Sequence, residues 1–233
     1  MLKAIQQQKK YKILLVGEYC DDVYVYGSID RISPEAPVPV FKKKRKEKKA
    51  GMSGNVLNNI NSLGKNIDNV YSYFNEPNLI KKIRFIDEKS KYQIMRYDIE
   101  NNIVPLTFKE ILKENYDAVV ISDYNKGYLT EELIEQITSH FSKSKIFADT
   151  KRKNLSCFKN CLIKLNKIES DMAYNVDISS KIVTTIGENG CIYMNKIYPT
   201  NKVNVYDVCG AGDVFLSSLV IGWLETNSII EAI

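Results

Sequence analysis

The sequence YDVCGAGD, residues 206–213, runs directly into the apolar stretch VFLSSLVIGWL, residues 214–224. Two glycines on either side of an alanine permit a tight backbone turn, and the apolar density behind them predicts a buried helix. The free N–H groups at the first turn of such a helix can bind a phosphate. A carboxylate at this point repels an anion, so we interpret Asp213 as a general base that takes a proton from a substrate hydroxyl. The alternative is an ordinary turn whose carboxylate only interacts with the helix dipole.

The pattern DxxGAGD followed by an apolar helix resembles the signature of the ribokinase-like (PfkB) sugar kinases. The resemblance implies that Asp213 is the catalytic base. The amides that form the anion hole would then be those of Gly210, Ala211 and Gly212. The implied fold is a three-layer α/β fold, in which helices flank a mainly parallel central sheet and a small β-strand lid covers the site. The implied cofactors are ATP and Mg²⁺, with K⁺ as a further candidate near Asp207.

The composition bounds the class of protein. The chain has 233 residues, of which 44% are hydrophobic, so we expect one domain with one core over residues 1–233. No apolar run approaches about 18 residues, and the N-terminus is polar and basic. We therefore expect neither a membrane span nor a secretory signal, and predict a cytoplasmic protein. The five cysteines are scattered and odd in number, which favours reduced thiols over disulfides or a zinc site.

The charge of the chain is distributed unevenly. The formal net charge of +5 suits an anionic substrate. Much of it lies in the run KKKRKEKK, residues 42–49, and such a run is usually a solvated face. The run has no interleaved aromatic residues and no known motif for reading nucleic acid. We therefore expect no nucleic-acid partner.

The N-terminal part of the chain predicts a strand followed by a lid. Residues 11–17 (YKILLVG) form a short apolar run that ends in glycine, which is typical of a buried parallel strand. Acids just beyond such a strand lie where open α/β sheets bind ligands, and Asp22 is the candidate. The alternative is that the acids only solvate a turn. Residues 31–41 contain three prolines, so we expect an extended edge or lid instead of a helix or a central strand.

The sequence RISPEAPVPV, residues 31–40, narrows the resemblance. It is similar to the kinase domain of the bacterial enzymes that phosphorylate D-glycero-D-manno-heptose 7-phosphate at C1. In that family Asp22 would contact sugar hydroxyls. The lid would close the site and pair two subunits, which predicts a homodimer through the β lid. We expect the lid strands at about residues 23–49 and 82–99.

Residues 50–64 predict a helix that begins with glycines. Apolar residues recur at helical spacing, and Gly64 is placed to end the helix. The stretch resembles the first family signature, GGxxxNVAxNxxxLG, which implies that Gly51 and Asn55 hold the sugar. The second glycine of that signature is Met52 here, a departure that would narrow the pocket. The alternative is that Asn55 only caps the helix.

Two further segments resemble the heptose kinases at the acceptor side. Residues 83–87 and 92–98 alternate around a charged turn and predict a lid hairpin, in which Arg96 matches an R-x-D pattern and could grip the sugar phosphate. The alternative is an exposed ion pair between Arg96 and Asp98. Residues 116–127 predict a second buried strand that ends in SDYNKG. This ending resembles the family's SDYxKG and implies that Asp123 and Lys126 lie beside the sugar or its phosphate.

Residues 131–141 predict a helix that Thr130 precedes, with Glu132 and Glu135 near its first turn. His140 is the only histidine and is expected at the surface near the C-terminus of this helix. Some members of this group carry a second, adenylyltransferase domain with an HxGH motif. With one histidine, this chain is expected to lack that motif.

The C-terminal part supplies the predicted nucleotide site. The segment that ends in Lys151 is similar to the family's D-P-K, and Asn166 and Glu169 match N-x-x-E, which implies that they position Mg²⁺ and the phosphate through water. Taken without the family, an N-x-x-E pair would be interpreted as exposed polar residues. Residues 181–193 resemble V-T-x-G-x-x-G, which implies that Thr185 and Gly187 line the ribose and phosphates.

Together these segments predict a kinase that transfers the γ-phosphate of ATP to the anomeric hydroxyl of heptose 7-phosphate. One alternative is a PfkB kinase with another sugar or a nucleoside as acceptor. The other is a non-catalytic, sugar-binding remnant. The remnant is considered because the chain ends at Ile233, soon after residues 214–224, whereas the family continues with further helices. We therefore expect a kinase domain that is short at its C-terminus.

Overall fold

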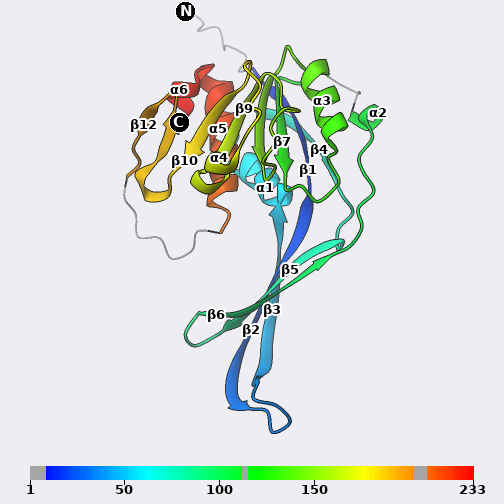
Figure 1. Ribbon diagram of the computed structural model, residues 1–233, viewed down its shortest axis with the longest axis vertical. Helices are drawn as coiled ribbons and strands as arrows, with labels where there is room; N and C mark the ends of the chain where they lie inside the picture. Colours follow the sequence, from blue (N-terminus) through cyan, green and yellow to red (C-terminus); the bar gives the residue numbers. More distant parts are fainter. Residues whose placement is uncertain (1–8, 112–114, 202–208) are drawn as a thin grey trace, which may run out of the picture.

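The body of the molecule is an eight-stranded sheet (Figure 1). The computed structural model describes residues 9–111, 115–201 and 209–233. The strand order is β12-β11-β10-β9-β8-β7-β1-β4, and all neighbours from β10 to β4 run parallel, whereas β11 and β12 are antiparallel additions. The strands are β1 (Tyr11–Gly17), β4 (Ile67–Phe74), β7 (Ala118–Asp123), β8 (Lys145–Thr150), β9 (Cys161–Asn166), β10 (Lys181–Thr185), β11 (Cys191–Tyr193) and β12 (Lys196–Tyr198).

Helices cover both faces of this sheet and make a three-layer arrangement. Successive side chains of a strand point to opposite faces, so a strand with helices on both sides is apolar at every position. In β1, Ile13 and Leu15 pack with the face that α1, α5 and α6 cover, whereas Leu14 and Val16 pack with α2 and α3. The helices are α1 (Ser53–Leu63), α2 (Phe108–Ile111), α3 (Glu131–His140), α4 (Lys167–Met172), α5 (Ala211–Thr226) and α6 (Ile229–Ala232).

Several local predictions are confirmed by these bounds. The apolar run at residues 11–17 is β1, and α1 ends where Gly64 closes its last turn. Thr130 caps α3, because its side chain accepts a hydrogen bond from the backbone N–H of Leu133 at 3.1 Å. His140 lies exposed in the last turn of α3, as expected.

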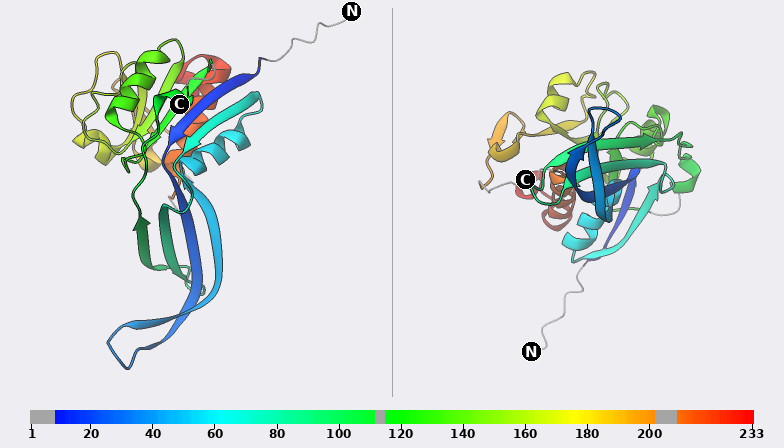
Figure 2. Two further views of the ribbon diagram at one scale, coloured as in Figure 1. Left: turned by 90° about the vertical axis from the view of Figure 1, so that its right-hand side faces the viewer. Right: turned by 90° about the horizontal axis from the view of Figure 1, so that it is seen from below.

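A second, four-stranded sheet forms the lid, in the order β3-β2-β5-β6. Figures 1 and 2 show it as a narrow arm that projects from the body. Its strands are β2 (Tyr19–Ile32), β3 (Pro39–Met52), β5 (Ile80–Asp87) and β6 (Gln93–Glu100). The proline-rich segment connects β2 to β3 at the tip of the arm. β2 begins only two residues after β1 ends, so Asp22 lies within a lid strand, and the alternative that it solvates a turn is wrong.

Two expectations about the chain as a whole can be compared with the structure. None of the five cysteines, all of which lie in the described residues, forms a disulfide; four are buried and Cys209 is exposed. Among the residues that the structure describes, no helix is long and apolar enough to cross a membrane.

Candidate active site

A cleft of about 610 Å³ opens where the lid joins the body, at the carboxyl ends of the parallel strands. It brings together five residues that the sequence had singled out from distant segments. They are Asp22, Gly51, Asn55, Gly210 and Asp213. Residues from the lid strands β2, β3 and β5 and from helices α1 and α5 therefore line a single cavity.

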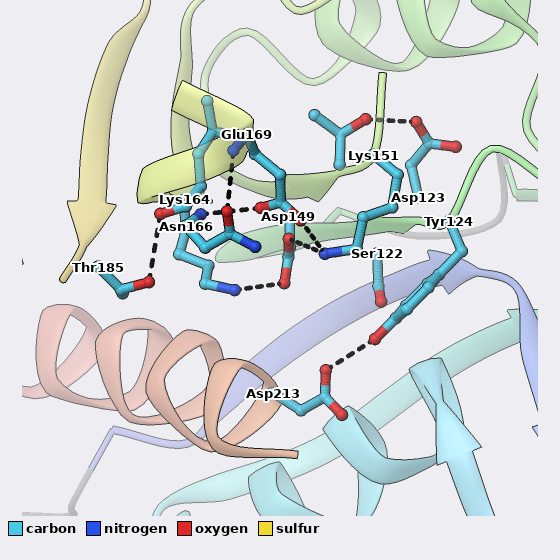
Figure 3. A network of polar contacts seen from close by, with 12 residues as sticks. Ser122, Asp123, Tyr124, Asp149, Lys151, Lys164, Asn166, Glu169, Thr185 and Asp213 are labelled. Atoms are coloured by element: carbon cyan, nitrogen blue, oxygen red, sulfur yellow. Dashed lines mark hydrogen bonds and ion pairs between the residues drawn. The ribbon is translucent and has the colours of Figure 1, made fainter. Parts of the chain in front are cut away.

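Asp213 lies at the bottom of this cleft, in the first turn of α5, and is 7% exposed. Its Oδ1 accepts a hydrogen bond from the Tyr124 hydroxyl at 2.9 Å (Figure 3). Its Oδ2 accepts one from Asn55 Nδ2 at 2.8 Å. Asn55 reaches Asp213 because α1 and α5 pack side by side through one apolar cluster. The alternative that Asn55 caps α1 is wrong, because Met52 is the N-cap residue and no side chain caps that helix.

The turn before α5 depends on Gly210, which has a left-handed backbone with φ of 81°. A β-carbon at this position would lie 2.8 Å from Asn55 Nδ2. Glycine therefore supplies both the conformation and the space that the turn needs. The first backbone N–H groups of a helix have no partner within the helix, so the start of α5 presents a partial positive charge at the cleft.

A buried ion pair lies directly behind the start of α5. Lys164 Nζ is 2.8 Å from Asp149 Oδ2, and the two residues are 3% and 4% exposed. A β-carbon on Gly212 would lie 2.6 Å from Lys164 Nζ, so the ammonium group packs against the backbone of the turn. Burial raises the pKa of Asp149, and the neighbouring ammonium of Lys164 opposes that rise. The arrangement adds a cation beneath the proposed anion hole.

The lid side of the cleft carries cationic side chains from β5. Arg84 Nη2 is 3.1 Å from Asp22 Oδ1, and the Arg84 side chain is 11% exposed. Within the described part of the chain, Arg84 Nε has no hydrogen-bond partner. Lys82 lies on the same face of β5, because side chains two residues apart share a face. Gly51 makes room for Asp22, since a β-carbon there would lie 2.7 Å from Asp22 Oδ2.

Three predicted acceptor residues do not line this cleft. Arg96 lies on the outer lid strand β6, opposite Arg84 in the ladder, and pairs with Asp98 at 2.9 Å. Asp123 is 1% exposed and accepts hydrogen bonds from other protein groups, as described below. Lys126 Nζ is 2.6 Å from Glu100 Oε1, outside the cleft. The substrate roles of these residues therefore stay predictions.

Asp123 is held by the last residue of β8 and by the loop that follows it. Its Oδ2 accepts hydrogen bonds from the Thr150 hydroxyl at 2.6 Å and from Arg152 Nε at 2.8 Å. The charge of Asp123 is thus paired inside the protein, which explains how a carboxylate can be buried at the end of β7.

A second pocket, of about 400 Å³, lies on the other side of the first turn of α5, against β10, β11 and β12. Its lining includes Thr185 and Gly187, which the sequence had assigned to nucleotide binding, together with Ala211 and Gly212. The first cleft contains Gly210 and Asp213. The first turn of α5 therefore borders both pockets. Asp213 lines the cleft, and Ala211 and Gly212 line the second pocket.

Asn166 and Glu169 form a capping box at the start of α4. Asn166 Oδ1 accepts from the Glu169 N–H, and Glu169 Oε2 accepts from the Asn166 N–H, both at 2.8 Å. Glu169 also pairs with Lys151 (Figure 3). Among the described residues, no group of three or more His, Cys, Asp or Glu side chains could hold a metal. The pair offers the oxygen donors that Mg²⁺ prefers, and few protein ligands suit an ion that keeps its waters.

Asp207, the candidate K⁺ ligand, lies outside the described residues, so its role stays a prediction.

The sequence analysis did not identify three side chains that line the cleft, Lys82, Arg84 and Tyr124. It also did not identify the buried Glu18, which accepts the backbone N–H of Tyr124. The alternation of β5 could have indicated Lys82 and Arg84, and Tyr124 stands inside the quoted SDYxKG motif. Glu18 is fully buried, and burial, with help from the charge of Asp123, raises its pKa to about 7.

The chain resembles known carbohydrate kinases in sequence. Residues 164–233 match the family described as pfkB family carbohydrate kinase. The chain is 30% identical to the bifunctional protein HldE of Aliarcobacter butzleri, over 97% of this chain and 59% of that protein. It is 32% identical to the bifunctional protein HldE of Sulfurimonas denitrificans, over 95% of this chain and 58% of that protein. The chain therefore spans less than two thirds of the length of these relatives.

The fold is shared with solved kinase structures. Phosphofructokinase-2 from Escherichia coli in complex with fructose-6-phosphate matches with a TM-score of 0.69 and 16% identity, over 96% of this chain and 90% of that chain. Ribokinase from Thermotoga maritima matches with a TM-score of 0.64 and 14% identity, over 95% and 89%. At these identities the similarity shows the fold alone, and it confirms the predicted ribokinase-like α/β fold with a mainly parallel sheet.

Proposed function

We propose that the chain is a carbohydrate kinase of the pfkB type, the family that residues 164–233 match, and that it transfers the γ-phosphate of ATP to a sugar hydroxyl. The observation that carries the proposal is the first turn of α5, which borders two pockets at once. Asp213 faces one pocket, and the backbone of Ala211 and Gly212 faces the other. An acceptor hydroxyl and a donor phosphate can thus approach the same turn from opposite sides.

In this mechanism Asp213 accepts the proton of the sugar hydroxyl as the hydroxyl oxygen attacks the γ-phosphorus in line. The new O–P bond forms while the bond to the β,γ-bridging oxygen breaks, and ADP leaves with that electron pair. The N–H groups of Gly210, Ala211 and Gly212 stabilise the charge on the transferring phosphoryl group. Lys164 adds a positive charge behind the turn, at 2.8 Å from its counter-ion Asp149.

The second pocket supports the proposed nucleotide site. Thr185 and Gly187 would line the ribose and phosphates of ATP, and Lys151 would approach the phosphates from the end of β8. Asn166 and Glu169 would hold Mg²⁺ through water, because their own oxygens already bond to the protein. When bound, Mg²⁺ neutralises charge on the phosphates.

For the acceptor we propose D-glycero-D-manno-heptose 7-phosphate, phosphorylated at its anomeric hydroxyl to the 1,7-bisphosphate. Asp22, Gly51 and Asn55 would contact the sugar. We assign the binding of its phosphate to Arg84 and Lys82, because both line the cleft, whereas Arg96 lies outside it. Arg84 Nε also has no hydrogen-bond partner in the part of the chain that the structure describes. The sequence similarity to two proteins named bifunctional protein HldE supports this choice.

The proposal includes a homodimer through the lid and a reaction in the cytoplasm, where ATP is available. Exposed apolar side chains on the arm support the dimer, since they would be buried by a second copy. They are Ile32, Val38, Tyr92, Met95 and Tyr97. Analytical ultracentrifugation tests this part, and a monomer at micromolar concentration would contradict it.

ADP release with Mg²⁺-ATP and a panel of acceptors tests the reaction. The panel contains heptose 7-phosphate, the same heptose without its phosphate, fructose 6-phosphate and ribose. We expect the highest kcat/KM with heptose 7-phosphate. A better acceptor elsewhere in the panel would replace the proposed substrate, and no ADP release with any acceptor would favour the non-catalytic remnant.

The variant Asp213→Asn tests the assignment of the base. It should lower kcat by about 10²-fold to 10⁴-fold, the usual contribution of a general base. Asp98→Asn is the control, because among residues 9–111, 115–201 and 209–233 this exposed carboxylate on β6 forms an ion pair only with Arg96. Near-normal turnover of Asp213→Asn would rule out its role as base.

A further inference from the structure

Tyr124 contacts the carboxylate that the proposed reaction depends on. It follows β7 directly, and its hydroxyl donates to Asp213 Oδ1 at 2.9 Å (Figure 3). Asn55 donates to Oδ2 at 2.8 Å. Each oxygen of the carboxylate is thus held by one donor from a different element. Burial and the negative charge of Asp213 both raise the pKa of Tyr124, so its hydroxyl keeps its proton and acts as a donor.

The backbone of Tyr124 is fixed by the buried Glu18. Glu18 Oε2 accepts the Tyr124 N–H at 2.8 Å. Glu18 Oε1 accepts the N–H groups of Lys126 and Leu129, each at 3.4 Å. One carboxyl group therefore holds three backbone positions of the segment after β7, which leaves the ring of Tyr124 little freedom to move.

The ring of Tyr124 lies between two lysines that belong to different sides of the site. Lys82 Nζ, from lid strand β5, is 5.4 Å from the ring centroid. Lys151 Nζ, which follows β8, is 5.5 Å from it. Both distances are within the range of cation–π attraction. Tyr124 is thus in contact with the lid, with the proposed nucleotide side and with the proposed base.

We infer that Tyr124 is a positioning residue, whose hydroxyl holds the Asp213 carboxylate in the orientation from which it takes the acceptor proton. This inference rests on the proposed kinase function and extends it to a residue that touches the base and is not itself proposed to react. With one lone pair of each oxygen occupied by Tyr124 or Asn55, each oxygen keeps a second lone pair, and Asp213 lines the cleft in which the acceptor is proposed to bind. A fixed base removes the need to reorient in the transition state.

The variant Tyr124→Phe keeps the ring and its two lysine contacts and removes only the hydroxyl. We expect kcat to fall by about 10-fold to 100-fold, the equivalent of one hydrogen bond to a charged group. KM for ATP and for the sugar should change by less than about 3-fold, because the bond acts on the base and not on either substrate. Tyr128→Phe is the matched control, since it changes a tyrosine of the same segment that lines a different pocket.

The outcomes separate this inference from the proposed function. A wild-type protein that turns over no acceptor overturns the proposed function and the inference with it. An active wild type with an unchanged kcat in Tyr124→Phe overturns the inference alone, and so does a raised KM with normal kcat. Thermal unfolding of both variants checks that each is folded.

A second measurement does not depend on turnover. In protein labelled with ¹³C at the tyrosine Cζ, the resonance missing from Tyr124→Phe identifies Tyr124. The chemical shift of this resonance should differ between Asp213→Asn and the wild type, because the variant removes the negative charge that accepts the hydrogen bond at 2.9 Å. An unchanged chemical shift would show that the hydroxyl is not held by Asp213, and would overturn the inference.

Discussion

Replacing Glu18 with glutamine should change how the stability of the protein depends on pH. Burial raises the pKa of Glu18 from 4.5 to about 7, so the folded state binds this proton more tightly than the unfolded state does. Protonated Glu18 therefore contributes stability that is fully present below pH 4.5, and this contribution is lost as the pH rises through about 7. At about 1.4 kcal/mol for each pKa unit, the loss between pH 5 and pH 8 is about 2.5 kcal/mol.

The variant Glu18→Gln removes this titration, because its side chain stays neutral. The amide oxygen can still accept backbone N–H groups, and any hydrogen bond that it loses costs the same at both pH values. The free energy of unfolding of the variant, relative to wild type, should thus rise by about 2.5 kcal/mol between pH 5 and pH 8.

Urea unfolding followed by circular dichroism at the two pH values measures this difference. Glu225→Gln is the matched control, because Glu225 is exposed and burial cannot act on it. If the difference between wild type and Glu18→Gln is the same at pH 5 and pH 8, Glu18 does not titrate as its burial requires and the reasoning is refuted.

Two further predictions concern the cleft. Gly210→Ala should destabilise the protein by about 1–2 kcal/mol, because a φ of 81° is strained for alanine. It should also lower kcat, because the new methyl group would clash with Asn55. A loss of stability with unchanged kcat would show that this turn is not needed for catalysis. Arg84→Gln should raise KM for a phosphorylated sugar by about 10-fold or more, the equivalent of a lost charged hydrogen bond, whereas Arg96→Gln should change it by less than about 2-fold. Steady-state kinetics checks both variants, and equal effects would contradict the placement of the phosphate at β5.

Local features of the structure could be predicted from the sequence because short stretches of chain decide them. The apolar run of β1 indicated burial on both faces, and Gly64 and Thr130 marked helix ends that the structure confirms. The start of α5 followed from the glycines around Ala211. Each of these depends on the conformational preferences of a few consecutive residues, which the tertiary fold does not override here.

The N-x-x-E pattern is compatible with two different roles of its residues. Asn166 and Glu169 form a capping box, which is a structural use of the same residues that the resemblance assigned to Mg²⁺ and phosphate. A sequence pattern cannot separate these uses, because both need an amide and a carboxylate three residues apart.

By itself the sequence determined strands β1 and β7, helices α1, α3 and α5, the glycine-rich turn before α5 and several of the residues that line the cleft. Only the tertiary structure decided which side chains meet. Asn55 and Asp213 are 158 positions apart and touch because α1 and α5 pack together. Arg84 and Arg96 lie opposite each other in neighbouring strands, and the strand order of the lid puts Arg84 in the cleft and Arg96 on the outer strand. Contacts of this kind depend on strand order, register and helix packing, which involve residues distant in the chain and leave no local pattern.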